Sequence, residues 1–178
     1  MSTSQGTQEK FILHWGEMGT RWGINRTVAQ THALIYVSER PLNAEEICET
    51  LQIARSNAST SLKELLAWGI IRIVHLKGDR RDHYESVKDV WELFRIVANE
   101  RRKRELDPTL GILDECLAEA PGADESPVFR ERLEKLKDFM ESMCAMHDAI
   151  NKLPTSALAR FSGSVETLVN LTGIGKGR

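Results

Sequence analysis

The chain has 178 residues, of which 41% are hydrophobic, and a formal net charge of −2 at pH 7. This composition is typical of a folded protein and argues against a disordered chain. No apolar run approaches the roughly 18 residues of a membrane-spanning helix, and the N-terminus lacks the pattern of a signal peptide, so we expect a cytoplasmic protein without membrane contact. Three widely separated cysteines predict no disulfide framework, and Cys144 with His147 is only a two-ligand spacing, so we expect neither metal nor cofactor.

The N-terminal part of the chain predicts two helices. Apolar residues recur at helical spacing over 8–18, which indicates the first helix. The segment 19–24 contains two glycines and is expected to form a turn. Asn25 is then expected to cap the second helix, which runs to about Glu39 before a break that contains Pro41.

The stretch from residue 43 onward predicts two helices separated by a short break. Asn43 and Glu46 have the spacing of a capping box at the start of the helix 44–51. A second helical pattern covers 55–68. Gly69 is expected to end that helix, because glycine tolerates the positive φ of a helix C-terminus.

A β-hairpin is predicted directly after these helices. Residues 71–76 alternate as in a strand, 77–82 supply a polar turn, and 83–87 form the return strand. Helix, short turn, helix and hairpin follow each other in the order of a winged helix-turn-helix. The expected fold class is therefore mostly α with a small β-hairpin.

The outer face of the helix 55–68 predicts contact with nucleic acid. Arg55, Ser59 and Lys63 lie four residues apart and share a face that carries no acidic residue before Glu64. Short hydrogen-bonding groups flanked by cations suit a major groove. A solvated helix face is the alternative, but surface helices usually mix acids with bases. The residues that the core does not need are Arg55, Ser56, Asn57, Ser59, Thr60, Ser61 and Lys63, and the hairpin tip adds Lys77, Arg80 and Arg81.

The distribution of charge supports this interpretation. Residues 54–81 carry a balance of +4, so the remainder of the chain carries −6. Basic charge is therefore concentrated on the part expected to contact DNA, and the rest of the chain would repel it.

The C-terminal part of the chain is predicted to be helical. A helix over 89–106 ends in the basic run 101–104, which suits the helix dipole better than it suits DNA contact. Asp107 and Pro108 are expected to break or restart the helix, and 109–120 continues it. After a loop at 121–125, Ser126 and Pro127 are expected to open a long helix that ends near Asn151.

The remaining segments are a last helix over 155–171 and a tail over 172–178. The long helix carries one near-heptad stripe made of Phe129, Leu133, Leu136, Met140, Met143 and His147. The N-terminal helix and the last two helices are too apolar on one side to stand alone in water. We therefore expect a homodimer, with a DNA-binding region over 1–106 and a dimerisation and effector region over 107–178.

Three segments of the chain, IARSNASTSLKELLAWGIIR, HLKGDRRDHYE and KDVWELFRIVANERRKRELDPTL, resemble the GbsR-type branch of the MarR-like winged-helix repressors. The resemblance covers about 11–117. It implies a homodimeric transcriptional regulator that binds double-stranded operator DNA. The contacts that the resemblance implies are Arg55, Ser56, Asn57, Ser59, Thr60 and Lys63 of the 55–68 helix and Arg80 and Arg81 of the hairpin tip, to which the charge of Lys77 is added. Several members of that branch respond to choline and control the uptake or synthesis of glycine betaine. This chain departs from related sequences at Ala54, which cannot cap the helix that follows, so that Ser56 caps it or its first turn frays.

The effector suggested by the resemblance needs an aromatic cage. Aromatic residues at helical spacing are more often part of a core, so a cage is one of two interpretations. A winged helix that serves as a protein–protein scaffold, a repressor that responds to an unrelated small molecule, and an enzyme with an appended DNA-binding part remain alternatives, although no residue set suggests catalysis. The candidate cage residues are Trp15, Trp22, Tyr84, Trp91 and Phe94.

Overall fold

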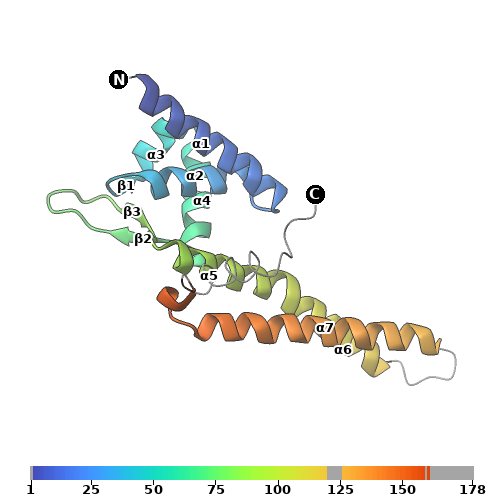
Figure 1. Ribbon diagram of the computed structural model, residues 1–178. Helices are drawn as coiled ribbons and strands as arrows, with labels where there is room; N and C mark the ends of the chain where they lie inside the picture. Colours follow the sequence, from blue (N-terminus) through green and yellow to red (C-terminus); the bar gives the residue numbers. More distant parts are fainter. Residues whose placement is uncertain (1, 120–125, 159, 161–178) are drawn as a thin grey trace. The chain divides into compact units, whose positions relative to one another are not determined.

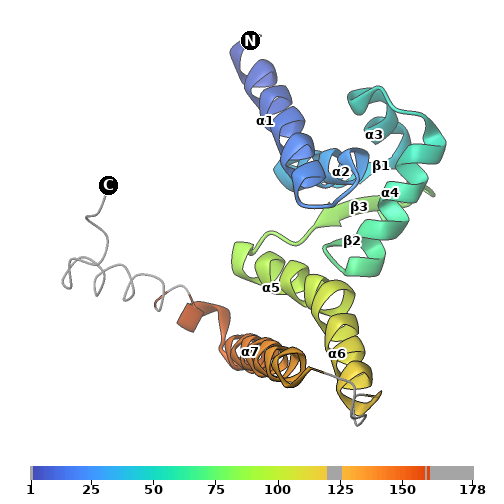
Figure 2. The ribbon, with the colours of Figure 1, turned by 90° about the vertical axis from the view of Figure 1, so that its right-hand side faces the viewer.

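The computed structural model describes residues 2–119, 126–158 and 160, and Figures 1 and 2 show its ribbon from two sides. The chain divides into two compact units, Met1–Ile96 and Val97–Arg178. The predicted loop at 121–125, the predicted tail and most of the predicted last helix lie outside the described residues. Within the described part, no helix has the length and apolar character needed to cross a membrane.

The first unit begins with α1 (Ser2–Arg21), which packs on α2 (Arg26–Val37). Gly19 lies inside α1, so the prediction that 19–24 forms a turn is wrong at its start. A Cβ atom on Gly19 would lie 2.5 Å from the Cβ of Ala29, so this glycine permits the two helices to approach closely. The turn itself is made at Gly23, whose φ is +76°.

The caps of the next helices agree with the sequence prediction. Asn25 Oδ1 accepts a hydrogen bond from the backbone N–H of Thr27 at 2.8 Å, which starts α2. Asn43 forms a capping box with Glu46 at the start of α3 (Ala44–Leu51). The helix that follows, α4 (Arg55–Trp68), ends at Gly69 in the left-handed conformation. Local cap residues therefore determine where these helices begin and end.

A three-stranded antiparallel sheet follows, with strand order β1-β3-β2. The hairpin strands β2 (Ile71–Val74) and β3 (His83–Ser86) are shorter than predicted. The additional strand β1 (Leu42–Asn43), which the sequence did not predict, pairs with His83 and Tyr84 of β3. The helix-turn-helix and its hairpin wing are thus joined by backbone hydrogen bonds at the start of α3.

The exit of the wing is attached to α2 by one buried polar contact and by hydrogen bonds from the exposed Lys88. Ser86 and His32 are both almost fully buried, and the Ser86 hydroxyl lies 3.3 Å from His32 Nε2. Lys88 Nζ donates to the carbonyls of Tyr36 at 2.7 Å and Ser38 at 3.1 Å. These carbonyls lie at the C-terminal end of α2, where they accept no further helical hydrogen bonds. The wing therefore has a defined position relative to the core.

A continuous helical segment leads into the second unit. It consists of α5 (Val90–Arg101), a π-helical turn η1 (Arg102–Leu106) and α6 (Asp107–Glu119). Of the two alternatives predicted at Asp107 and Pro108, the structure shows the restart and not the break: α6 begins at Asp107, whose φ and ψ of −60° and −44° are helical. Pro108 has no N–H to donate, and its ring crowds the preceding helical turn. The wider π turn η1 accommodates this proline within the helical segment.

The long helix α7 (Pro127–Lys152) begins after Ser126, as predicted, although the Ser126 side chain makes no cap hydrogen bond. Its predicted single apolar stripe is wrong. Met140 and Cys144 are buried, whereas Phe129, Leu136 and Met143 are exposed. The helix therefore carries two apolar faces, of which only one is covered by the described part of the chain.

The basic run at 101–104 is ion-paired with acids of its own helical region. Arg101 pairs with Glu105 at 3.5 Å, and Lys103 pairs with Glu100 at 2.9 Å. Arg102 pairs with Asp107 at 3.2 Å and also contacts Asp148 of α7. Hydrogen bonding to Asp148 and Asp107 raises the pKa of Arg102. Only the contact of Arg102 with Asp148 joins two helices, and the other pairs lie within one helical segment. That segment continues through η1 into α6, so the basic run does not lie at a helix C-terminus as the sequence interpretation assumed.

Candidate nucleic-acid interface

The two faces of α4 differ sharply in composition. Its buried face consists of Ala58, Ser61, Leu62 and Leu65, which pack toward α2 and α3. Ser61 is only 2% exposed, so its assignment to the outer face was wrong. The other outer-face residues are all exposed, as their spacing predicts: Arg55, Ser56, Asn57, Ser59, Thr60 and Lys63. This face presents two cations and four short polar side chains to solvent.

Ala54 stands at the N-cap of α4, with φ −65° and ψ 148°, and provides no side-chain hydrogen bond. The first full backbone hydrogen bond of the helix runs from Ala58 N–H to Ala54 C=O at 3.1 Å. A serine at this position would supply the missing acceptor.

Two cations extend from the wing without an intramolecular ion pair. Lys77 and Arg80 are exposed, and no carboxylate of the described residues pairs with either. Both lie in the loop beyond Val74 and His83, which form the last pair of the β2–β3 ladder. Their charges therefore remain available to an anionic partner.

Arg81 differs from these two cations because carboxylates surround its guanidinium group. Its Nε lies 3.0 Å from Asp79 Oδ1 and its Nη2 lies 2.6 Å from Asp79 Oδ2, a two-pronged ion pair. Its Nη1 donates to Glu45 Oε2 at 2.9 Å. Hydrogen bonding to the side chain and the backbone N–H of Arg81 lowers the pKa of Asp79 far below its usual value. The sequence grouped Arg81 with Arg80, but the structure gives the two arginines different surroundings.

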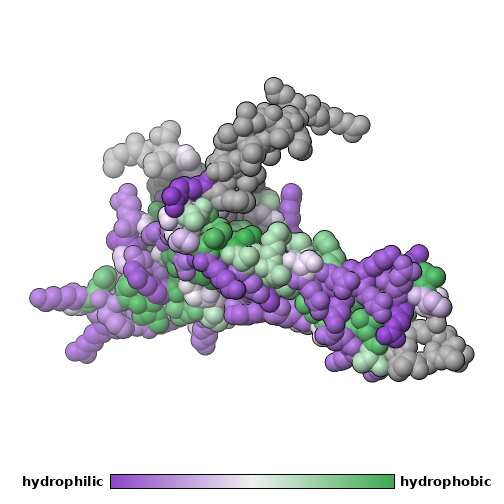
Figure 3. Space-filling model, turned by 60° about the horizontal axis from the view of Figure 1, so that its bottom comes forward, coloured by the Kyte–Doolittle hydropathy of each residue, from purple (hydrophilic) through white to green (hydrophobic). Residues whose placement is uncertain are grey.

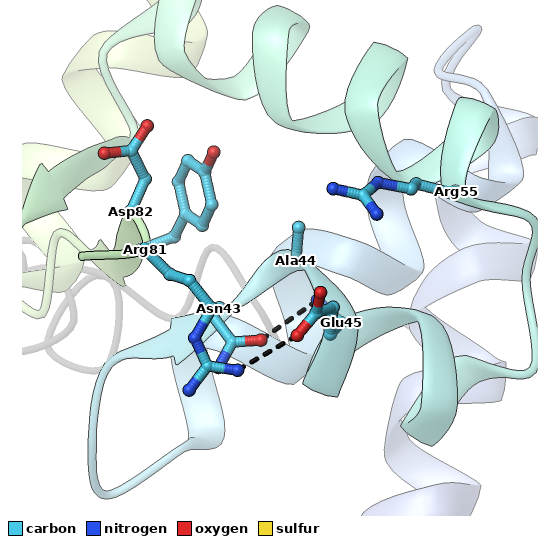
Figure 4. A pocket seen from close by; sticks show the side chains of 7 residues that line it. Asn43, Ala44, Glu45, Arg55, Arg81 and Asp82 are labelled. Carbon is cyan, nitrogen blue, oxygen red and sulfur yellow. Dashed lines mark hydrogen bonds and ion pairs between the residues drawn. The ribbon is translucent and has the colours of Figure 1, made fainter. Parts of the chain in front are cut away.

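A hollow of about 230 Å³ separates α4 from the base of the wing. Figure 4 shows Arg55 entering it from the first turn of α4, while Arg81 reaches Glu45 on the opposite side. Burial and the charge of Asp82 raise the pKa of Tyr84, whose ring also lines the hollow. Sequence reasoning missed Glu45 and Asp82 as part of this surface. The Asp79-x-Arg81 spacing is the one local signal that could have suggested the paired arginine.

The five candidate cage residues come from separate elements. Trp15 and Trp22 pack edge to face with ring centroids 6.1 Å apart. Tyr84 lies in β3, whereas Trp91 and Phe94 lie on α5. A second hollow, of about 590 Å³, lies at the α1–α2 turn and is lined by the following polar, charged and aliphatic residues: Glu17, Thr20, Arg21, Ile24, Asn25 and Arg26. None of the five aromatic side chains lines that hollow. The described residues also contain no group of three or more histidine, cysteine, aspartate or glutamate side chains placed to hold a metal ion.

These elements define a winged helix-turn-helix, with α3 and α4 as the two helices and the β2–β3 hairpin as the wing. Residues 22–82 match the model of the MarR family. A solved crystal structure described as a transcriptional regulator has the same fold, with a TM-score of 0.64 and 20% sequence identity over 88% of this chain and 99% of that chain.

Two proteins of Bacillus subtilis (strain 168) are similar in sequence. The protein described as "Putative HTH-type transcriptional regulator YvaV" is 27% identical over 148 residues, which cover 75% of this chain and 80% of that protein. The HTH-type transcriptional repressor OpcR is 25% identical over 87 residues, or 49% of this chain and 47% of that protein. The chain thus has the winged helix-turn-helix fold, its residues 22–82 are similar to the MarR family, and it is similar in sequence to HTH-type transcriptional regulators.

Proposed function

We propose that this regulator is a homodimeric, sequence-specific DNA-binding repressor that responds to a small molecule. The exposed face of α4 is the observation that carries the proposal. Short side chains such as Asn57, Ser59 and Thr60 let a helix enter a major groove, where they can reach base edges. Arg55 and Lys63 flank them and can reach guanine or phosphate. The similarity to the repressor OpcR supports the repressor role.

The wing adds contacts of a different kind. Lys77 and Arg80 lie on a loop, and their exposed charges suit the phosphate backbone or the adjacent minor groove. We therefore assign base reading to α4 and backbone contact to the wing. A winged helix used as a protein scaffold would present an apolar outer face on α4, which this chain does not have.

A duplex selected from a random library by the wild-type protein tests this assignment. Asn57→Ala should weaken binding to the selected duplex by about 1–3 kcal/mol and leave binding to random DNA nearly unchanged. Lys63→Ala should weaken binding, whereas Lys10→Ala, which removes an exposed lysine from α1, should not. Equal losses on selected and random DNA for Asn57→Ala would show that α4 does not read sequence.

The uncovered face of α7 supports the proposed homodimer. Two series of apolar residues recur every seven positions, Phe129, Leu136 and Met143 in one and Phe139, Met146 and Leu153 in the other. Together the two series have the spacing of a coiled-coil seam. All six side chains are at least 38% exposed in the single chain. Figure 3 shows that hydrophobic residues reach the surface among hydrophilic ones on the face that it draws. A second copy of the chain would cover this seam.

Sedimentation of two neighbouring variants tests the seam. Met146→Glu places a charge in it and should shift the protein toward the monomer. Ala145→Glu places the same charge one residue outside it and should leave the dimer intact. A wild-type monomer at micromolar concentration would contradict the proposed dimer.

The resemblance to GbsR-type sequences extends the proposal to an effector of the choline type, and hence to a role in glycine betaine uptake or synthesis. Aromatic residues that could contact a quaternary ammonium group include Trp15 and Trp22, which already lie in contact with each other. Choline should release heat on binding and weaken binding to the selected duplex. If choline releases no heat while an unrelated ligand does, choline is not the effector.

A further inference from the structure

The long helix α7 uses only one of its two apolar faces within the chain. Met140 and Cys144 are buried in the second unit, and Lys137 on the same face reaches Asp114 of α6 at 2.5 Å. The exposed seam residues each come one position before a residue of this face, so they lie about 100° away around the helix. The described part of the chain therefore leaves the seam open to a partner.

One position of the seam carries a charge. Seven positions before Phe139 stands Arg132, in the place that Phe139, Met146 and Leu153 hold in the following heptads. Arg132 is exposed, and no carboxylate of the described residues pairs with it. None of the residues three or four positions away from it is acidic. The seam thus contains one cation, close to the N-terminal end of α7.

This cation distinguishes the two ways in which α7 can pair with α7 of a second copy. If both helices run in the same direction, equivalent residues meet, and Arg132 would lie beside the partner's Arg132 near two helix N-termini. Like charges repel, and the positive end of each helix dipole also disfavours a cation there. Pairing in the same direction is therefore unfavourable at this position.

Pairing in opposite directions removes both penalties. An alignment centred near Glu141 places Arg132 at the C-terminal end of the partner's α7, where backbone carbonyls without a helical N–H partner favour a cation. The same alignment gives each exposed apolar residue of the seam an apolar neighbour: Phe129 beside the partner's Leu153, Leu136 beside the partner's Met146, and Phe139 beside the partner's Met143.

We propose that the α7 helices of two copies pair in opposite directions through this seam and that Arg132 sets the direction. This inference rests on the proposed homodimer. A single polar residue in a seam commonly selects one arrangement of a coiled coil over another, at some cost in stability. With a rise of 1.5 Å per residue, the two copies of Glu131 would lie about 30 Å apart along the paired helices and the two copies of Ala145 about 12 Å apart. Helices that run in the same direction would give equal separations.

Spin-label distances in the full-length dimer test the direction. Cys48, Cys116 and Cys144 are first replaced by serine or alanine, and one cysteine is then introduced by Glu131→Cys or Ala145→Cys. Both positions are exposed, and they lie two heptads apart on the same side of the seam. The label separation at position 131 should exceed that at position 145 by roughly 10 Å or more.

Sedimentation of charge variants tests the role of Arg132 without replacing any cysteine. Arg132→Glu should raise the dissociation constant of the dimer about three- to thirtyfold, because an acid would then lie at each helix C-terminus. Arg130→Glu makes the same change of charge two residues away, outside the seam, and should change the constant less than about twofold.

Equal label separations at the two positions, or a dimer that Arg132→Glu tightens, would overturn the pairing in opposite directions, because both results are expected of helices that run in the same direction. An unchanged dissociation constant for Arg132→Glu would overturn the role of Arg132. A wild-type protein that sediments as a monomer would instead overturn the proposed homodimer, before any variant is compared.

Discussion

His32 makes the stability of the first unit dependent on pH. Its side chain is 6% exposed, and burial, followed by the charge of Lys88, lowers its pKa from 6.5 to about 4. Between these pH values the unfolded chain binds a proton at His32 and the folded chain does not. Stability is therefore complete above pH 6.5 and falls as the pH falls toward 4. At about 1.4 kcal/mol per pKa unit, the loss from this one group reaches roughly 3 kcal/mol.

Urea unfolding of the wild type and of His32→Gln, from neutral pH down to about pH 4, isolates this contribution. Glutamine does not titrate and can still hydrogen-bond to Ser86, which lies 3.3 Å from His32 Nε2. At neutral pH the free energy of unfolding of His32→Gln should be lower than that of the wild type. It should, however, decrease less than that of the wild type as the pH falls. The carboxylates titrate in both proteins, so their effects cancel in the difference between the two curves. Parallel curves would refute the argument that His32 is kept neutral by burial. Fixed protein concentration is required, because dimerisation would also contribute to stability.

Substitutions at three further positions test how the helices are built, each by thermal or urea unfolding. Gly19→Ala should destabilise the fold by about 1–3 kcal/mol, because its Cβ would lie 2.5 Å from that of Ala29; an unchanged midpoint would show that α1 shifts freely. Ala54→Ser should stabilise the fold by about 0.5–2 kcal/mol by capping α4, and no shift would mean that another group already does so. Asn43→Ala should cost about 1–2 kcal/mol, whereas Asn43→Asp keeps the acceptor for the N–H groups of Glu45 and Glu46 and should cost less.

The parts of the fold that depend on local signals could be predicted from the sequence. The starts of α2 and α3 follow from the Asn25 cap and the Asn43–Glu46 capping box, and the end of α4 follows from Gly69, which adopts a positive φ. The exposed face of α4 follows from helical periodicity in the same way. These features need no knowledge of the rest of the chain.

The features that were missed depend on residues distant in sequence. His32 and Ser86 are 54 positions apart, and Glu45 and Arg81 are 36 apart, so no spacing rule connects them. The strand β1 has two residues, too few to give a recognisable alternation, and exists because β3 offers it hydrogen bonds. Ser61 was misplaced because its polarity suggested exposure, whereas its position between Ala58 and Leu65 places it on the buried face.

The composition of α4 also explains why its role in core packing can be tested separately from its proposed role in DNA contact. Two of its four buried residues, Ala58 and Ser61, have small side chains, so the helix backbone can lie close to the elements beneath it. Leu62 and Leu65 supply most of the apolar area that α4 buries, at about 25 cal/mol per Å². The six outer-face side chains are all exposed, and substitutions there should leave stability within about 0.5 kcal/mol of the wild type. A loss of DNA affinity in Asn57→Ala or Lys63→Ala can then be attributed to the interface itself and not to unfolding of the helix that presents it.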